Sequence, residues 1–230
     1  MSKDAKQLIL DLIKEKSILK QDVYQNTQDR FDDFREVLKE TVEQIQGEIG
    51  DTDERLSFYY KEKGVYEAEI KLAGDILIFY MHTNVFQFDK SHSLWRSGYL
   101  KDDPDNGYVG VIYIYNFLAD SFKFSRKNDR GYLIARVFVN RDNHFLVQGK
   151  RQLGFLYNDF INSELSKVRI KDVVNSAILY ALDFDLFAPP YQSQQEVSVK
   201  DIEALSQNLN IVTGKRLGFK FTNDDDSPES

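Results

Sequence analysis

Residues 107–154 have the sequence GYVGVIYIYNFLADSFKFSRKNDRGYLIARVFVNRDNHFLVQGKRQLG, and this stretch decides the fold. β-branched and aromatic residues fill short runs within it, and polar turns separate these runs. We predict four consecutive antiparallel strands, at 108–115, 122–126, 132–139 and 144–149. The first of them is almost continuously apolar, which predicts a strand that is buried on both faces.

The last two of these strands should form a hairpin across residues 140–143. If Val139 pairs with His144, then Arg136 lies opposite Val147. Arg136 then shares a sheet face with apolar neighbours, namely Tyr132, Ile134, Phe138, Phe145 and Val147. A guanidinium in such a patch needs a partner, because an unpaired buried charge costs on the order of several kcal/mol.

Positive charge is concentrated in the same stretch. Ser121–Arg151 holds eight basic and two acidic residues, a net charge of +6 within a chain whose total is −7. Aromatic residues alternate with these cations, as in Phe122-Lys123-Phe124. We predict a site for an anionic ligand here, with Arg136, Lys123, Arg126, Trp95 and His144 as its binding residues. The alternative is structural: lysine and arginine protect edge strands, and Arg136 pairs with an acidic residue of a helix.

Upstream of this stretch, the sequence predicts a meander of further antiparallel strands. Apolar and charged residues alternate strictly over 66–72, which indicates one buried and one wet face. Short turns join this run to its neighbours, at 56–60, 76–81 and 85–88, and turns this short exclude parallel pairing. Residues 89–106 form a long polar break that contains Trp95 and His92, and we expect it to be a mobile element that serves as a lid or a binding loop.

The N-terminal region is predicted to be helical. Apolar residues such as Leu8, Leu12 and Leu19 recur at helical spacing across 5–46, whereas most other positions are polar or charged. This pattern predicts one long helix, or a helical hairpin broken near Asn26-Thr27. Such a helix either packs on the sheet or extends as a coiled-coil arm that pairs with a second copy of the chain.

After Leu153 the pattern returns to helix, and the sequence predicts helices at 164–182 and 198–209 and a strand at 216–221. The acidic tail lacks apolar residues and should be disordered. The predicted fold is α+β, a largely antiparallel meander sheet covered by helices, with an N-terminal long amphipathic helix or helical hairpin. Its predicted parts are a helical arm at 1–50, a sheet domain with C-terminal helices at 51–222 and the tail at 223–230.

The composition excludes several classes of protein. The absence of cysteine excludes disulfides, thiol catalysis and cysteine-ligated zinc. The N-terminus is too densely charged for a signal peptide and no run reaches eighteen apolar residues, so we expect a cytoplasmic protein with no membrane partner. No phosphate-loop, dinucleotide, GxSxG or HExxH motif occurs. His82, His92 and His144 lack metal-ligand spacing, so the sequence predicts no metal and specifies no cofactor.

From these observations we expect a non-catalytic binding or interaction module, sensory or scaffolding, that forms a homodimer through residues 5–46. A first alternative is an enzyme acting on an anionic, phosphorylated small substrate, which Arg136 would hold while His92 or His144 exchanges a proton. A second alternative is binding of single-stranded nucleic acid, which the net charge of −7 disfavours. The sequence specifies neither the ligand nor a catalytic residue.

Overall fold

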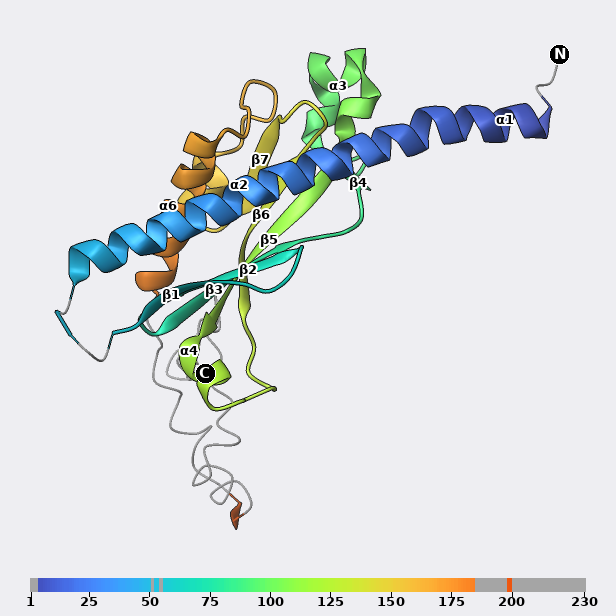
Figure 1. Cartoon of the computed structure of the whole chain (residues 1–230). Coiled ribbons are helices and arrows are strands. Elements are labelled where there is room, and N and C mark those ends of the chain that lie inside the picture. The colour runs from blue at the N-terminus through green and yellow to red at the C-terminus, as the bar shows by residue number, and fades with distance from the viewer. Residues whose placement is uncertain (1–3, 51, 54–55, 185–197, 200–230) are drawn as a thin grey trace, which may run out of the picture.

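The computed structural model describes residues 4–50, 52–53, 56–184 and 198–199. The predicted strand at 216–221 and the tail at 223–230 lie outside the described residues, as does almost all of the predicted helix at 198–209. Within the described part the fold is the predicted α+β class, a long N-terminal helix and an antiparallel sheet accompanied by further helices (Figure 1).

A single helix runs through the N-terminal region. It consists of α1 (Ala5–Leu12), a π-helical turn η1 (Ile13–Ser17) and α2 (Ile18–Ile49), and it is roughly 65 Å long at 1.5 Å per residue. The predicted break near Asn26-Thr27 is wrong, because α2 passes through both residues without interruption. The helix ends at Gly50, whose φ of 54° lies in the left-handed region that favours glycine.

Seven strands of the described part form one antiparallel sheet in the order β1-β2-β3-β5-β6-β7, and β4 pairs with β5 outside this path. The strands are β1 (Phe58–Glu62), β2 (Glu67–Leu72), β3 (Asp75–Met81), β4 (Phe86–Gln87), β5 (Tyr108–Leu118), β6 (Tyr132–Val139) and β7 (Phe145–Gly149). Short helices lie between them or follow them: η2 (Ser93–Arg96), α3 (Gly98–Asp102), η3 (Pro104–Gly107), α4 (Ala119–Lys123) and α5 (Gln152–Leu156). The predicted meander is therefore confirmed for the first three strands.

Helices α2 and α6 (Lys167–Leu182) contact each other and cover one face of the sheet, and α6 confirms the helix predicted at 164–182 (Figure 1). Phe34 of α2 and Phe79 of β3 are fully buried there, with ring centroids 5.9 Å apart. The helix also approaches β5 closely, because a Cβ added at Gly110 would lie 2.0 Å from the Thr27 Oγ1. Glycine is therefore required at this contact between helix and sheet.

The hairpin of β6 and β7 is confirmed, but its predicted register is wrong. Val139 pairs with Phe145, one residue beyond its predicted partner. Phe145 and Val147 consequently belong to the core under the helices. Ile134 lies in the same core for another reason, because a β-bulge in β6 at Ile134 changes which face the residues before Ala135 occupy. Arg136 lies on the opposite face of the sheet, so the predicted set of apolar neighbours is wrong for these three residues and for Tyr132, which is partly buried against the same core.

The turn of this hairpin explains the shift. The Asn140 Oδ1 accepts hydrogen bonds from the backbone N–H groups of Asp142 and His144, at 3.0 and 2.9 Å. A side chain that satisfies two backbone donors of its own turn favours a longer loop than strand pairing alone would give. His144 is thereby kept out of the strand, and pairing resumes at Phe145.

The strand predicted at 122–126 is wrong. β5 continues to Leu118, and the chain then forms α4 and a compact turn. In this turn the Ser121 Oγ donates to the Asp129 Oδ2 at 2.6 Å, and the Arg126 Nε lies 3.4 Å from the same carboxylate oxygen. These local polar contacts replace a sheet ladder in the segment.

β5 is also less deeply buried than its composition suggested. Tyr113, Tyr115 and Phe117 are only half-buried, whereas Ile112 and Ile114, which alternate with them, are buried in the core. The prediction of burial on both faces is therefore wrong for the second half of the strand, where one face is open.

Candidate functional site

The sheet face opposite α2 and α6 carries a row of aromatic and polar side chains. Glu67, Tyr80, Tyr113, Arg136 and Gln148 are successive cross-strand partners from β2 to β7. The rings of Tyr80 and Tyr113 are stacked, with centroids 6.4 Å apart. Because directly opposed residues on adjacent strands lie side by side, one Arg side chain is placed at the end of an aromatic row.

A cavity of about 680 Å³ lies where this row meets the chain segment around β4. Its apolar walls include Phe86, Phe88, Tyr113, Phe138 and Leu146. Its polar lining includes Arg136, Gln148, His92, Asp89 and Asn158. Largely aromatic walls with a few polar groups are typical of small-molecule sites, and the volume falls within their usual range of roughly 300–1,000 Å³.

Arg136 is the cation of this cavity. One Nη atom donates a hydrogen bond to the Gln148 Oε1, and the guanidinium lies 5.2 Å from the centroid of the Phe138 ring. Among the residues that the structure describes, no carboxylate forms an ion pair with it. The charge of Arg136 also affects Tyr115. Burial raises the pKa of Tyr115, and the positive charge of Arg136 opposes that rise.

The other predicted ligand-binding residues do not join Arg136. Lys123 and Arg126 lie beyond the far end of β5, roughly 17 Å along the strand from Tyr113 at 3.3 Å per residue, and Arg126 pairs with Asp129. The +6 stretch therefore does not form one cationic face.

Trp95 and His144 have structural contacts close to the cavity but do not line it. The Trp95 Nε1 donates to the backbone oxygens of Phe88 and Asp89, at 3.3 and 2.9 Å. The His144 ring is stacked on Tyr99, with centroids 4.8 Å apart, and its Nδ1 lies 3.0 Å from the Phe160 carbonyl oxygen. Both side chains thus stabilise the loop that holds the cavity wall.

The histidines predicted as acid–base groups are separated. His92 lines the same cavity as Arg136, whereas His144 is engaged with Tyr99 outside it. Within the described ranges, no three or more His, Asp or Glu side chains are grouped in a way that could hold a metal ion. The arrangement supports ligand binding at Arg136 more than acid–base chemistry by a pair of histidines.

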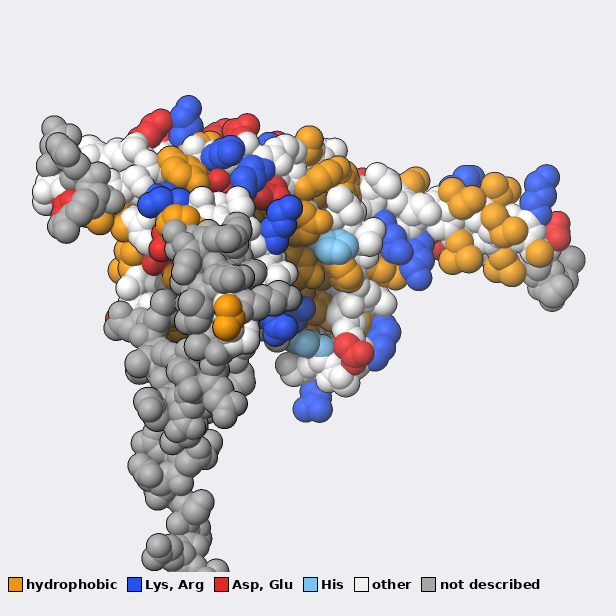
Figure 2. Space-filling model, turned by 90° about the horizontal axis from the view of Figure 1, so that it is seen from below, with side chains coloured by type: hydrophobic (Ala, Val, Ile, Leu, Met, Phe, Trp, Pro, Cys, Tyr) orange, Lys and Arg blue, Asp and Glu red, His pale blue; other side chains and the backbone are white. Residues whose placement is uncertain are grey.

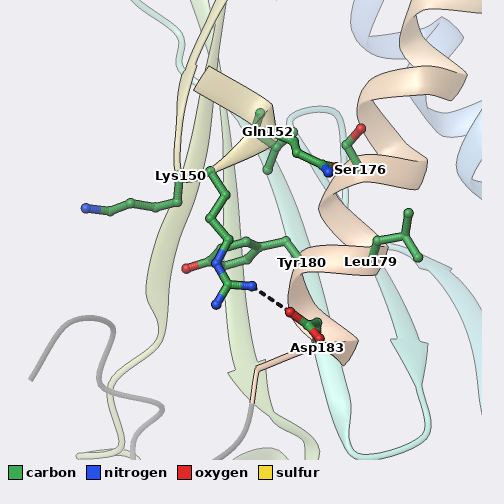
Figure 3. A pocket seen from close by; sticks show the side chains of 8 residues that line it. Lys150, Gln152, Ser176, Leu179, Tyr180 and Asp183 are labelled. Carbon is green, nitrogen blue, oxygen red and sulfur yellow. Dashed lines mark hydrogen bonds and ion pairs between the residues drawn. The ribbon is translucent and has the colours of Figure 1, made fainter. Parts of the chain in front are cut away.

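A second, smaller cavity of about 280 Å³ lies between α5 and α6 (Figure 3). Its Arg151 forms an ion pair with Asp183 at 2.6 Å and lies 5.4 Å above the Tyr180 ring. Burial raises the pKa of Tyr180, and the Arg151 charge opposes that rise. Because its cation already has a carboxylate partner, this cavity is the weaker candidate for an anion.

The first turns of the long helix form a different kind of site. We call residues 5–18 the arm. The arm projects beyond the sheet, and Figure 2 shows hydrophobic side chains gathered on it. No residue of α1 or η1 is buried. Leu8, Ile9, Leu12 and Ile13 are 47%, 57%, 58% and 54% exposed.

Comparison with known proteins finds no matching family model, no matching curated protein and no matching solved structure. Of the helices in the described ranges, none combines the length and apolar character that a membrane span requires. The chemistry of the arm and of the cavity is therefore the basis for a functional proposal.

Of the aromatic walls, Phe138 was predicted from the sequence to share a sheet face with Arg136, whereas Tyr113 and Phe86 were not identified as lining residues. A signal for Tyr113 was present, because aromatic residues occupy alternate positions 113, 115 and 117 of β5 with aliphatic or amide residues between them. Such alternation indicates that two unlike faces exist. Nothing comparable marks Phe86, which reaches the cavity through the pairing of β4 with β5.

Proposed function

We propose that this chain is a non-catalytic interaction module that self-associates by pairing its arm with the arm of a second copy. The observation that carries the proposal is the exposed apolar surface of the arm. Contiguous apolar patches on a monomer's surface usually mark an interaction site, whereas single exposed residues do not. Here four large aliphatic residues at helical i, i+4 spacing lie on one side of a projecting helix.

The charge of the arm favours a second copy over a membrane surface. Residues 5–18 contain two acidic and three basic residues, so the net charge of the arm is +1. Helices that lie on membranes usually carry a polar face rich in lysine and arginine. An arm with a net charge of only +1 is little repelled by an identical arm, and a symmetric pair offers each arm an equal apolar surface.

The spacing of the apolar residues favours an antiparallel pair. Reversing the arm about the point between Leu10 and Asp11 exchanges Ile9 with Leu12. Leu8 is exchanged with Ile13 by the same operation, so the apolar set matches itself, as a two-fold interface requires. An antiparallel arrangement also places the two folded bodies at opposite ends of the pair, where they cannot collide, whereas a parallel pair would bring both bodies to the same end.

The expected dimer is weak. Completing the burial of eight half-exposed aliphatic side chains contributes on the order of 10 kcal/mol. Association costs roughly 4–15 kcal/mol, so the surplus is small. The arm covers only two heptads, whereas durable coiled coils usually have three or more. We therefore expect a dimer whose population rises over the micromolar to millimolar concentration range.

Light scattering coupled to size exclusion tests this proposal. The mass of the wild-type chain should rise from 26.8 kDa towards twice that value with increasing concentration. Leu12→Ser should remain a monomer at every concentration. Leu179→Ser is the matched control, since Leu179 is 64% exposed on α6, away from the arm, and this variant should associate like the wild type.

Two results would overturn the proposal. One is a wild-type chain that stays monomeric at the highest attainable concentration. The other is a wild-type chain that binds phospholipid vesicles but shows no increase in mass in solution, if Leu12→Ser abolishes the vesicle binding. The second result would reassign the arm to a membrane surface.

A further inference from the structure

We propose that the larger cavity, on the sheet face opposite α2 and α6, binds a small molecule that combines a flat ring with an oxyanion. Arg136 would contact the oxyanion. This inference goes beyond self-association, because no residue of the arm lines the cavity. The ligand is defined by its chemistry: it carries an aromatic or heteroaromatic ring and one carboxylate or phosphate monoester, joined directly or through a short linker such as a sugar.

The anionic part of the ligand follows from Arg136. Its guanidinium has five N–H donors, and the side-chain acceptor that the structure gives it is the neutral Gln148 Oε1. A half-buried cation without a carboxylate partner in the described residues retains both its charge and spare donors. Arginine binds carboxylates and phosphates through paired hydrogen bonds, so an oxyanion could accept hydrogen bonds from the remaining N–H groups of Arg136.

The flat part of the ligand follows from the walls. Phe86, Phe88, Tyr113 and Phe138 line the cavity, and the His92 ring is stacked on Phe88 with centroids 5.0 Å apart. Ring pairs in stacked or edge-to-face contact are stabilised by more than their buried area alone provides, so a flat ring is favoured against these walls. The position of Arg136 over Phe138 also directs the guanidinium along this aromatic wall.

Asp89 limits the charge of the ligand. It lines the same cavity, and its carboxylate accepts hydrogen bonds from the Ser91 Oγ at 2.5 Å and the Ser91 backbone N–H at 2.8 Å. These hydrogen bonds lower the pKa of Asp89, so the group is anionic at neutral pH. A second oxyanion near Asp89 would be repelled, and we therefore expect a ligand with one anionic group.

The only tryptophan of the chain is a built-in reporter for this cavity. Trp95 donates its indole N–H to the backbone of Phe88 and Asp89, and both of these residues line the cavity wall. A ligand that displaces water from the wall should change the Trp95 emission, because indole fluorescence responds to the polarity around the ring.

Three probes separate the parts of the proposal: biphenyl-4-carboxylate, its neutral analogue biphenyl-4-carboxamide, and adenosine 5′-monophosphate. Titration of the full chain should change the Trp95 emission with at least one of the two anions. The amide should bind at least about 10-fold more weakly than the carboxylate, since a charge-assisted bond to Arg136 is absent. The relative affinities of carboxylate and phosphate distinguish the two oxyanions.

Arg136→Gln should weaken binding of the anions at least about 10-fold and leave the weak binding of the amide unchanged. Arg136→Lys should lose part of the affinity, because lysine keeps the charge but not the paired geometry. Arg151→Gln, in the smaller cavity, is the matched control and should bind like the wild type. Circular dichroism confirms that each variant is folded.

The inference is overturned if neither anion changes the emission at millimolar concentration, or if Arg136→Gln binds the carboxylate as well as the wild type does. It is also overturned if the amide and the carboxylate bind equally. These results are independent of the proposed self-association, because the Leu12→Ser monomer should bind the same probes with unchanged affinity.

Discussion

The long N-terminal helix has two parts with the same kind of apolar spacing and opposite environments. One is the arm, and the other is residues 19–49, which we call the packed half. In the arm, Leu8, Leu12 and their apolar neighbours are about half exposed to solvent. In α2, Leu19, Val23 and Phe34 repeat the same kind of spacing but are buried against the sheet and its edge. The difference lies in what faces the helix, because the sheet extends beneath one half only (Figure 1).

This comparison shows that helical periodicity identifies the apolar face of a helix but does not identify what packs against that face. A helix of this length is stabilised mainly by the tertiary contacts of its apolar face. The packed half makes such contacts with the sheet of its own chain. The arm buries none of its apolar residues, and it is helical because it continues the packed half. The arm should therefore matter for association and little for folding, whereas the packed half should show the reverse.

The largest expected effect comes from the packed half. Phe34→Ala should lower the free energy of unfolding by about 3–5 kcal/mol, because Phe34 is fully buried and in contact with Phe79. Leu12→Ser should change the unfolding of the monomer by no more than about 0.5 kcal/mol. Urea denaturation at a concentration where the chain is monomeric measures both values. Equal losses in the two variants would contradict the division of the helix into two halves.

A smaller effect is expected from alkaline pH, and it involves the packed body of the protein and not the arm. The Tyr24 hydroxyl of α2 lies 2.6 Å from that of Tyr66, and this hydrogen bond, with burial, raises the pKa of Tyr24. In β1, burial and the neighbouring Glu69 raise the pKa of Tyr59 to about 12. Raised tyrosine pKa values mean that the folded state favours the neutral phenol, so their stabilising contribution is complete below pH 10 and is lost as the pH rises towards 12.

Thermal melts between pH 9 and 12 check this prediction. The melting temperature should fall through that window in the wild type and fall less steeply in Tyr24→Phe combined with Tyr59→Phe. The arm contains no tyrosine, so Leu12→Ser should follow the wild-type curve. A double Phe variant as sensitive as the wild type would show that other groups control the alkaline transition.

The sequence predicted the architecture better than it predicted the details. The helical spacing of the N-terminal region, the alternation over 66–72 and the hairpin of β6 and β7 were sufficient for the α+β class. The side-chain bonds of Asn140 shifted the hairpin register, and the Asp129 contacts made a turn where a strand was expected. Such local side-chain competition with the backbone leaves no periodic signal in a sequence.

The candidate site was predicted in part: of the predicted ligand-binding residues only Arg136 lines the cavity, and the loop at 89–106 contributes Asp89 and His92 to it. Arg136 was singled out as a charge among apolar neighbours, and the structure places it in the larger cavity, although on the other side of the sheet from Phe145 and Val147. The aromatic walls come from strands that are distant in sequence, so their convergence depends on the pairing of β4 and β5. The boundary between the arm and the packed half could not be predicted from the sequence either, because it depends on where the sheet beneath the helix ends.

Cysteine crosslinking tests the central claim, the antiparallel pairing of arms, most directly. The chain has no native cysteine, so each introduced thiol is unique. We would mix an Ile9→Cys chain with a tagged Leu12→Cys chain, oxidise the mixture and separate the three possible dimers by gel electrophoresis. Leu179→Cys, on α6, is the control for random collision.

We expect the mixed disulfide between the Ile9→Cys and Leu12→Cys chains to form faster than either symmetric disulfide. An antiparallel pair brings Ile9 of one chain opposite Leu12 of the other, within the short range that a disulfide needs. A symmetric Ile9→Cys disulfide that forms fastest would indicate parallel arms. Crosslinking no faster than in Leu179→Cys would contradict arm pairing altogether.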